Sequence, residues 1–206
     1  MHELISFAIL WFFLAVPIGP NALISIDSSI QYGWPRAVMV PLGIAVASIV
    51  YSSLSLTVLA YLLKLAPVLF KLIIILGSFY LLYLGYKILT RPALEGSGAI
   101  KDIKNNKLMF LGFTTSLSNP KAALIYLSVF PAMAHSGDID PITLIVTACA
   151  ITFFVYCAYS GFANLFRDFV IGFPRRQKLM DVLACLSFSL IALQNIYYAI
   201  TEKALT

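Results

Sequence analysis

Residues 108–134, LMFLGFTTSLSNPKAALIYLSVFPAMA, form a long and almost uncharged run. Its only charged residue is Lys121. At a rise of about 1.5 Å per residue, a helix of this length is long enough to cross the roughly 30 Å hydrocarbon core of a bilayer. Strands of an outer-membrane barrel would be about 10 residues long and would alternate in polarity, which this stretch does not do. It therefore predicts a transmembrane helix.

Five further apolar runs predict five more spans: Leu4–Ile26, Ala37–Leu63, Pro67–Thr90, Pro141–Phe166 and Val182–Thr201. Of the 206 residues, 61% are hydrophobic and 11% are charged, whereas soluble domains carry roughly 25% charged residues. This composition excludes a soluble globular domain and a disordered chain. The first run lacks a basic leader and an A-x-A site, so we expect it to be a span and not a cleaved signal peptide. The sequence predicts an all-α membrane protein of six transmembrane helices, with residues 1–206 as a single transmembrane domain.

Lysine and arginine are distributed unequally between the loops. The loops after the first, third and fifth spans share one side of the membrane, and that side carries Arg36, Lys87, Arg91, Lys101, Lys104, Lys107, Arg167, Arg175, Arg176 and Lys178. The opposite side carries Lys64, Lys71 and Lys203. The positive-inside rule places the basic side in the cytoplasm and both termini outside it. The net charge of +5 is then explained by membrane topology, and no nucleic-acid partner is expected.

The two halves of the chain share a pattern of prolines. Gly19-Pro20-Asn21-Ala22 in the first run is similar to Asn119-Pro120-Lys121-Ala122 in the fourth, and the interval from Pro41 to Pro141 equals that from Pro20 to Pro120. Two halves of three spans each must insert in opposite senses, which gives an inverted repeat. We expect a first repeat over residues 1–90, a cytoplasmic linker over 91–107 and a second repeat over 108–206.

Pro20 and Pro120 are expected to interrupt the first and fourth helices near the membrane midplane. Proline removes a backbone N–H and clashes with the carbonyl one turn earlier. The freed carbonyls cannot face lipid, so an interrupted helix must face protein or a wet cavity. Prolines also kink membrane helices without binding anything, which is the alternative here. Matched interruptions in two halves favour a substrate site between them.

Lys121 is the strongest candidate for a binding residue. It stands too deep in its run to reach the interface, so its ammonium must face the bundle interior or water. Asp27, Asp168 and Asp181 stand at the ends of apolar runs, and no acidic residue lies at mid-depth to pair with it. A helix beginning at Pro120 would direct its positive end to the same place, which suits a carboxylate. A structural pair with a carbonyl or an acidic side chain is the alternative.

The substrate-binding residues predicted from these patterns are Gly19, Pro20, Asn21, Ser48, Tyr51, Asn119, Pro120 and Lys121.

The cysteines do not indicate redox or metal chemistry. Cys149, Cys157 and Cys185 lie inside apolar runs without a C-x-x-C pair, which is typical of buried thiols. No H-E-x-x-H motif is present. We expect no cofactor, no metal site and no enzymatic activity. The expected partners are a small molecule and the lipid bilayer, and a homo-oligomer is compatible with the pattern. A divalent-metal exporter and a passive channel are the alternatives to a carrier.

The sequence resembles the LysE-type family of amino-acid exporters over nearly its whole length. Three segments carry the resemblance: Gly19-Pro20-Asn21, Gly77-Ser78-Phe79-Tyr80-Leu81-Leu82-Tyr83-Leu84-Gly85, and Phe110-Leu111-Gly112-Phe113 followed by Asn119-Pro120-Lys121-Ala122. Gly33 and Gly43 fit further glycines of the family pattern. The resemblance implies a six-helix carrier of the prokaryotic inner membrane that exports amino acids or related metabolites, driven by the proton gradient.

The chain also departs from the family pattern. Ile18 replaces the first proline of the Pro-Gly-Pro turn, and Ala37 and Ala47 replace glycines. Ser48 stands where many members have Asp. If that Asp takes a coupling proton or holds a substrate ammonium in relatives, the role is missing here.

Overall fold

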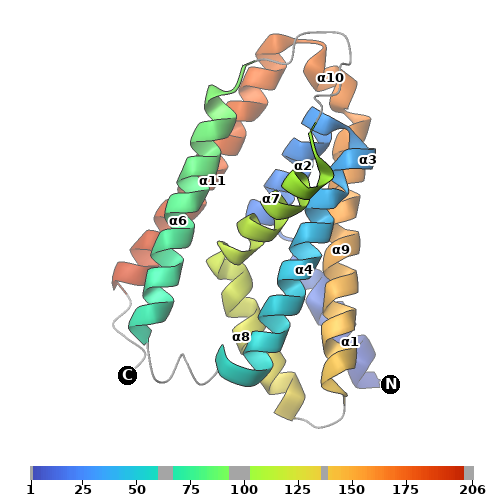
Figure 1. Cartoon of the computed structure of the whole chain (residues 1–206), viewed down its shortest axis with the longest axis vertical. Helices are drawn as coiled ribbons and strands as arrows, with labels where there is room; N and C mark the ends of the chain where they lie inside the picture. Colours follow the sequence, from blue (N-terminus) through green and yellow to red (C-terminus); the bar gives the residue numbers. More distant parts are fainter. Residues whose placement is uncertain (1, 60–66, 93–102, 136–138, 202–206) are drawn as a thin grey trace.

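The computed structural model describes residues 2–59, 67–92, 103–135 and 139–201, and within these ranges every regular element is a helix (Figure 1). The elements are α1 (His2–Ala15), α2 (Pro20–Tyr32), α3 (Trp34–Ala37), α4 (Met39–Leu54), the π-helical turn η1 (Ser55–Leu59), α6 (Pro67–Thr90), α7 (Asn105–Leu117), α8 (Pro120–His135), α9 (Pro141–Leu165), α10 (Arg167–Ile171) and α11 (Pro174–Thr201).

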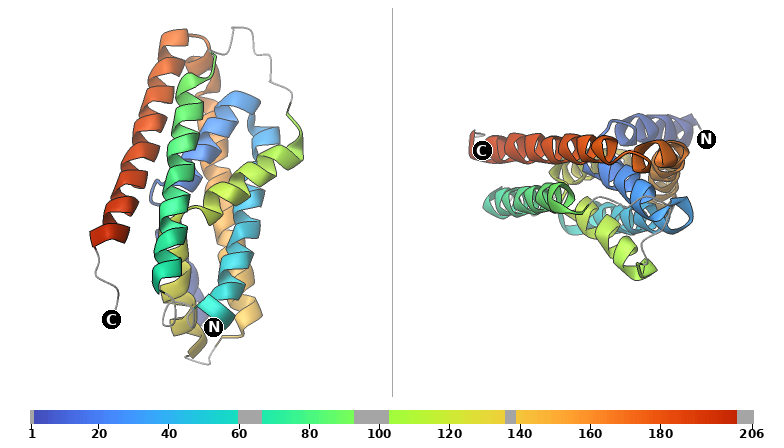
Figure 2. Two further views of the ribbon diagram at one scale, coloured as in Figure 1. Left: turned by 60° about the vertical axis from the view of Figure 1, so that its left-hand side comes forward. Right: turned by 90° about the horizontal axis from the view of Figure 1, so that it is seen from above.

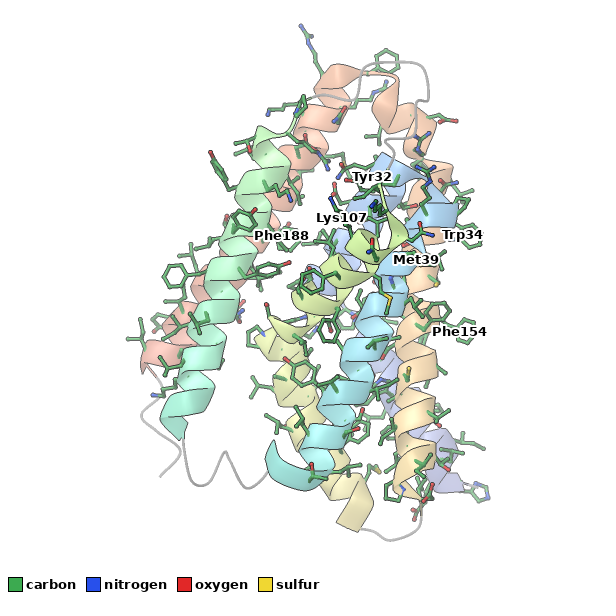
Figure 3. The ribbon with its side chains drawn as sticks, in the orientation of Figure 1. Tyr32, Trp34, Met39, Lys107, Phe154 and Phe188 are labelled. Carbon is green, nitrogen blue, oxygen red and sulfur yellow. The ribbon has the colours of Figure 1, made fainter. Side chains whose placement is uncertain are left out.

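Several of these helices have the length and composition of membrane spans. Three are long and apolar enough, at Trp34–Thr57, Pro141–Leu165 and Arg175–Thr201, and the bent pair α1 and α2 makes a fourth. Two shorter apolar helices cover Ile74–Thr90 and Pro120–Met133. Many outward-facing side chains are large and apolar: Phe79 is 58% exposed, and Phe154, labelled in Figure 3, is 68% exposed. An apolar exterior of this kind identifies a multi-pass membrane protein.

The helix interruptions expected at Pro20 and Pro120 are present. Helix α1 ends at Ala15, α2 begins at Pro20, and their axes differ by 67°. Helix α7 ends at Leu117, and α8 begins at Pro120. Each proline occupies the first position of its helix, where its missing N–H leaves no hydrogen bond unmade. Both interruptions lie about midway along the bundle (Figure 1).

The helices form a main bundle and a separate pair. Helix α4 packs against α7 and α9, and α9 also packs against α1 and α2. Helices α6 and α11 pack mainly against each other and form a pair that stands to one side of the bundle (Figures 1 and 2). Phe188 of α11 is fully buried in the core that this pair shares with α2, α4 and α7.

Three charged residues are more deeply placed than the sequence indicates. Asp27 and Asp181 were expected at the ends of spans, but α2 continues to Tyr32 and α11 begins at Pro174, so both aspartates lie inside helices. They are 8% and 2% exposed. Arg91, assigned to the linker, contacts both of them. A rule that ends each span at the first charged residue cannot detect a buried ion pair.

Other expected boundaries differ less. The run Pro67–Thr90 coincides with α6, and the fifth run matches α9 to within one residue. Asn105 and Lys107, expected in the linker, belong to the first turn of α7. The linker segment Gly96–Gly98 and the expected end of the second span at Leu63 lie outside the described residues.

Candidate functional site

A pocket lies where the two interrupted helices meet, and we call it the break pocket. It is an open pocket with a cavity volume of about 40 Å³. Its polar lining comes from Gly19, Asn21, Ser116, Asn119 and Lys121, together with Thr152. Trp11, Leu14, Ala15, Pro17, Ala122, Ile125, Tyr126 and Tyr156 complete the wall. Residues far apart in the sequence are thus brought together, as the matched prolines predict.

Lys121 lies in the first turn of α8 and lines the break pocket. Its side chain is exposed in the structure, and no hydrogen-bond acceptor or carboxylate among the described residues pairs with it. The positive end of α8 adds to the charge of the ammonium. The pocket therefore presents a positive group that has no counter-ion in this part of the chain.

Asn21 and Asn119 stand at the two helix starts and are 4% and 5% exposed. The side-chain amide of Asn21 donates to Ser116 Oγ at 3.2 Å, which ties the first interruption to the end of α7. The Oδ1 atoms of both asparagines are buried and accept no hydrogen bond from the described residues. A buried acceptor without a donor costs about 1–3 kcal/mol, so both oxygens are ready to accept from a bound molecule.

An aromatic cluster forms one wall of the pocket. The ring of Trp11 meets Tyr126 edge to face, with centroids 4.7 Å apart, and its indole N–H donates to Thr152 Oγ1 at 3.1 Å. Phe7 and Phe130 pack behind Trp11. The hydrogen bond and the packing fix the Trp11 ring in one orientation. A fixed, mostly apolar wall suits an aliphatic or aromatic group of a ligand.

Ser48 and Tyr51 lie behind this wall and do not line the pocket. The Tyr126 hydroxyl donates to Ser48 Oγ. Tyr51 stacks on Tyr126, with ring centroids 5.5 Å apart, and donates to the Leu117 carbonyl at 2.7 Å, next to the second interruption. Both residues of α4 therefore contact the site through Tyr126 and the end of α7.

Pro20 and Pro120 are buried and start the helices that carry Asn21 and Lys121. The aromatic residues Trp11, Tyr126 and Tyr156 were absent from the predicted site. A single sequence offers no signal to separate such residues from ordinary core aromatics. Only the pairing of α1 with α9 across the bundle brings Trp11 to Thr152.

The arrangement suits binding and not bond-breaking chemistry. It offers one cation, two amide oxygens and a largely apolar wall. The three cysteines are free thiols. Among the described residues, no group of three or more His, Cys, Asp and Glu side chains is placed to hold a metal ion.

Comparisons with known proteins place the chain in a family. The LysE type translocator family matches residues 12–199. The chain is 30% identical over 193 residues to a leucine efflux protein of Klebsiella pneumoniae, covering 91% of this chain and 88% of that protein. It is 31% identical over 178 residues to leucine efflux proteins of Salmonella choleraesuis and Salmonella typhimurium, covering 83% of this chain and 82% of theirs.

No solved structure matches the chain at a significant level. The family match extends from α1 to α11 and includes both interruptions and every residue that lines the break pocket except Trp11. The chain therefore belongs to the LysE type translocator family, whose members are transporters and not enzymes.

Proposed function

We propose that this chain is a secondary carrier that exports an α-amino acid with an aliphatic side chain, and that the break pocket is its substrate site. One observation carries the proposal: Lys121, a cation without a partner among the described residues, lines a pocket between two interrupted helices of an apolar bundle. Intramembrane ionisable groups mark substrate pathways by default, because a charge at membrane depth is costly and is rarely kept without a function.

Each part of an amino acid has a counterpart in the pocket. The Lys121 ammonium and the positive end of α8 attract the carboxylate. The buried Oδ1 atoms of Asn21 and Asn119 are acceptors for the substrate ammonium once it reaches them. Leu14, Ala122 and Ile125, with the ring of Trp11, would enclose an aliphatic side chain. The relatives named as leucine efflux proteins agree with a substrate of this size and polarity.

We further propose six spans in two inverted repeats of three. Helix packing supports this proposal: the first interrupted span packs on α9 of the other half, and the second, α7–α8, packs on α4 of the first half. Helices α4 and α9 pack on each other, as do α6 and α11. Exchanging the two halves leaves this set of partners unchanged, as an inverted repeat requires.

In this proposal the protein lies in the inner membrane with both termini outside the cytoplasm. Arg36, Arg91, Arg167 and Arg176 lie at the same end of the bundle, where α2, α6 and α9 end (Figure 1). The positive-inside rule assigns that end to the cytoplasm. We propose proton coupling as well. Its test is leucine efflux from vesicles with and without an imposed pH gradient.

The substrate site is tested by leucine efflux from loaded proteoliposomes that contain Lys121→Met. We expect efflux to fall by about a hundredfold, as for loss of a charged pair worth about 3 kcal/mol. The matched control is Lys107→Met, which removes an exposed lysine from α7, in the same interrupted span but outside the pocket. Equal efflux by both variants, at equal protein levels, would refute the role of Lys121.

The same preparation tests the substrate class. Leucine should compete for efflux, whereas its analogues lacking either the carboxylate or the amino group should compete weakly, because each leaves one set of pocket groups unpaired. The deaminated acid keeps the carboxylate but lacks the amino group. If it competes strongly, the proposed role of Asn21 and Asn119 is wrong, whereas that of Lys121 is unaffected.

A further inference from the structure

The α6–α11 pair contacts both interrupted helices and, at one end, the short helix α10. Gly77 of α6 packs directly on Ser118, the residue before the second interruption: a Cβ at Gly77 would lie 2.4 Å from the Ser118 carbonyl oxygen. One turn on, the Tyr80 and Thr114 hydroxyls are hydrogen-bonded at 2.8 Å. These contacts join α6 to the helix break that carries Asn119 and Lys121.

The other junction is a buried ionic cluster of Asp27, Arg91 and Asp181. Arg91, directly after α6, holds Asp27 of α2 with both arms of its guanidinium: Nη1 lies 3.0 Å from Oδ2 and Nη2 lies 2.7 Å from Oδ1. Nη2 also lies 2.5 Å from Oδ1 of Asp181 on α11. Gln31 donates to Asp27 Oδ2 at 2.6 Å. Forked arginine–carboxylate pairs are among the strongest and most directional polar contacts.

The cluster is well positioned to control access to the break pocket. Helix α2 begins at the pocket with Pro20 and Asn21, and Asp27 lies about two turns further along the same helix. A second pocket lies beside the cluster, between α2, α10 and α11, and its lining includes Asp27, Arg91 and Asp181. The ionic contact thus borders a cavity between α2 and α11, so these two helices are not closely packed around it.

Arginine is suited to such a contact because it remains charged. Burial alone would lower the pKa of Arg91, but the carboxylates of Asp27 and Asp181 outweigh that effect and raise the pKa above its ordinary value. The arginine therefore keeps its charge at every physiological pH. The ionic contact is broken by separation of the helices and not by deprotonation of the arginine.

We propose that Arg91 is a positioning residue of the transport cycle, which latches the α6–α11 pair onto α2 and thereby closes the path from its own end of the bundle to the break pocket. When the latch opens, the pair moves away from α2 and exposes the pocket on that side. Because Gly77 and Tyr80 contact the second interruption, the same movement displaces Lys121 and links opening to the state of the substrate site. The proposal rests on transport by the family and not on the identity of the substrate.

Thiol labelling from each side of the membrane tests the latch. Ala122 lines the break pocket, and Ala122→Cys in a background with Cys149, Cys157 and Cys185 replaced by Ala reports its accessibility to a charged, membrane-impermeant reagent. We expect Arg91→Gln to raise labelling about tenfold or more from the side on which Arg91 lies, and not from the other side. Asp168, which is 98% exposed on α10, identifies that side when replaced by Cys.

Three companion variants separate a latch from general loss of structure. Arg91→Lys keeps the charge but cannot form the forked contact with Asp27, so it should restore only part of the closed state. Arg176→Gln removes an arginine of α11 that stacks on Phe169 and Phe173, at the same end of the bundle, and should leave labelling unchanged. Arg91→Gln with Asp27→Asn and Asp181→Asn removes all three charges, so the buried carboxylates are no longer left unpaired, and it should fold well while still labelling rapidly.

Two results would overturn the latch. One is labelling that Arg91→Gln does not change, and the other is labelling that rises equally from both sides. Adding Lys121→Met to Arg91→Gln should leave the labelling pattern unchanged. If the proposed substrate site is wrong, Lys121→Met will show normal efflux, and the labelling result for Arg91→Gln will stand regardless.

Discussion

Gly43 of α4 and Gly112 of α7 each lie against the backbone of the other's helix. A Cβ at Gly43 would be 1.9 Å from the Met109 carbonyl oxygen, and a Cβ at Gly112 would be 2.1 Å from that of Val40. The two glycines let α4 and α7 pack backbone against backbone. Small residues at such crossings let backbones approach, and membrane helices associate largely through that packing.

Gly43→Ala and Gly112→Ala should each destabilise the protein by about 1–3 kcal/mol, the usual cost of overpacking a tight core. The backbone has to shift, because the clashing atoms belong to main chain and cannot rotate away. Thermal unfolding in detergent measures the effect. Gly85→Ala is the control, since its Cβ would meet the nearest atom of Cys185 at an ordinary 3.4 Å. Equal unfolding midpoints for all three variants would contradict the close crossing.

Gly77→Ala should impair both stability and transport. The added methyl group would push α6 away from Ser118, next to the interruption that carries Lys121, and the atoms it meets are again main chain. We expect a loss of stability of about 1–3 kcal/mol, as for Gly43→Ala, and an efflux rate that falls by about tenfold in the protein that remains folded. Normal efflux in a folded Gly77→Ala protein would indicate that the contact between α6 and the interruption has no role in transport.

Replacement of Trp11 should change substrate selectivity. Trp11→Ala removes a large ring from the pocket wall and leaves Thr152 without its donor. We expect the KM for leucine to rise by about tenfold, because apolar contact in a pocket is worth about 1–3 kcal/mol per methylene group, while bulkier amino acids become better substrates. Competition efflux assays measure both effects, and Phe154→Ala, on the outer face of α9, is the control. An unchanged substrate ranking would place the side-chain subsite elsewhere.

Gly33 allows the chain to turn between α2 and α3. Its φ of 73° and ψ of 154° fall in a region that only glycine occupies without strain. Gly33→Ala and Gly33→Asn should therefore both lower the free energy of unfolding by about 1–3 kcal/mol. Denaturation in detergent measures this loss. If Gly33→Asn has the same free energy of unfolding as the unmodified protein, the prediction is wrong and the turn is an ordinary left-handed one.

The spans and the interruptions could be predicted from the sequence because their causes are local. An apolar run needs a bilayer, and a proline inside it ends a helix, so α6 and the starts of α2 and α8 follow from composition and from Pro20 and Pro120. The gathering of Asn21, Asn119 and Lys121 in one pocket follows from matching the two halves.

The remaining features depend on contacts between distant segments. Asp27 and Arg91 look like span ends, because the sequence does not distinguish a charged residue that has a buried partner from one that faces water. From the sequence, Trp11 and Tyr126 cannot be told from ordinary core residues. Their place in the pocket wall depends on the packing of α1 against α9 and of α4 against α8. The wall of the pocket depends on tertiary packing, which produces no periodic pattern in the sequence.

The position of Trp11 also gives the protein an optical reporter of its own. The chain has 2 tryptophans, and the other, Trp34, is 44% exposed on α3 and does not line the break pocket (Figure 3). Replacing Trp34 by Phe would leave a single indole, and its emission would then follow the filling and emptying of the cavity in the unlabelled carrier.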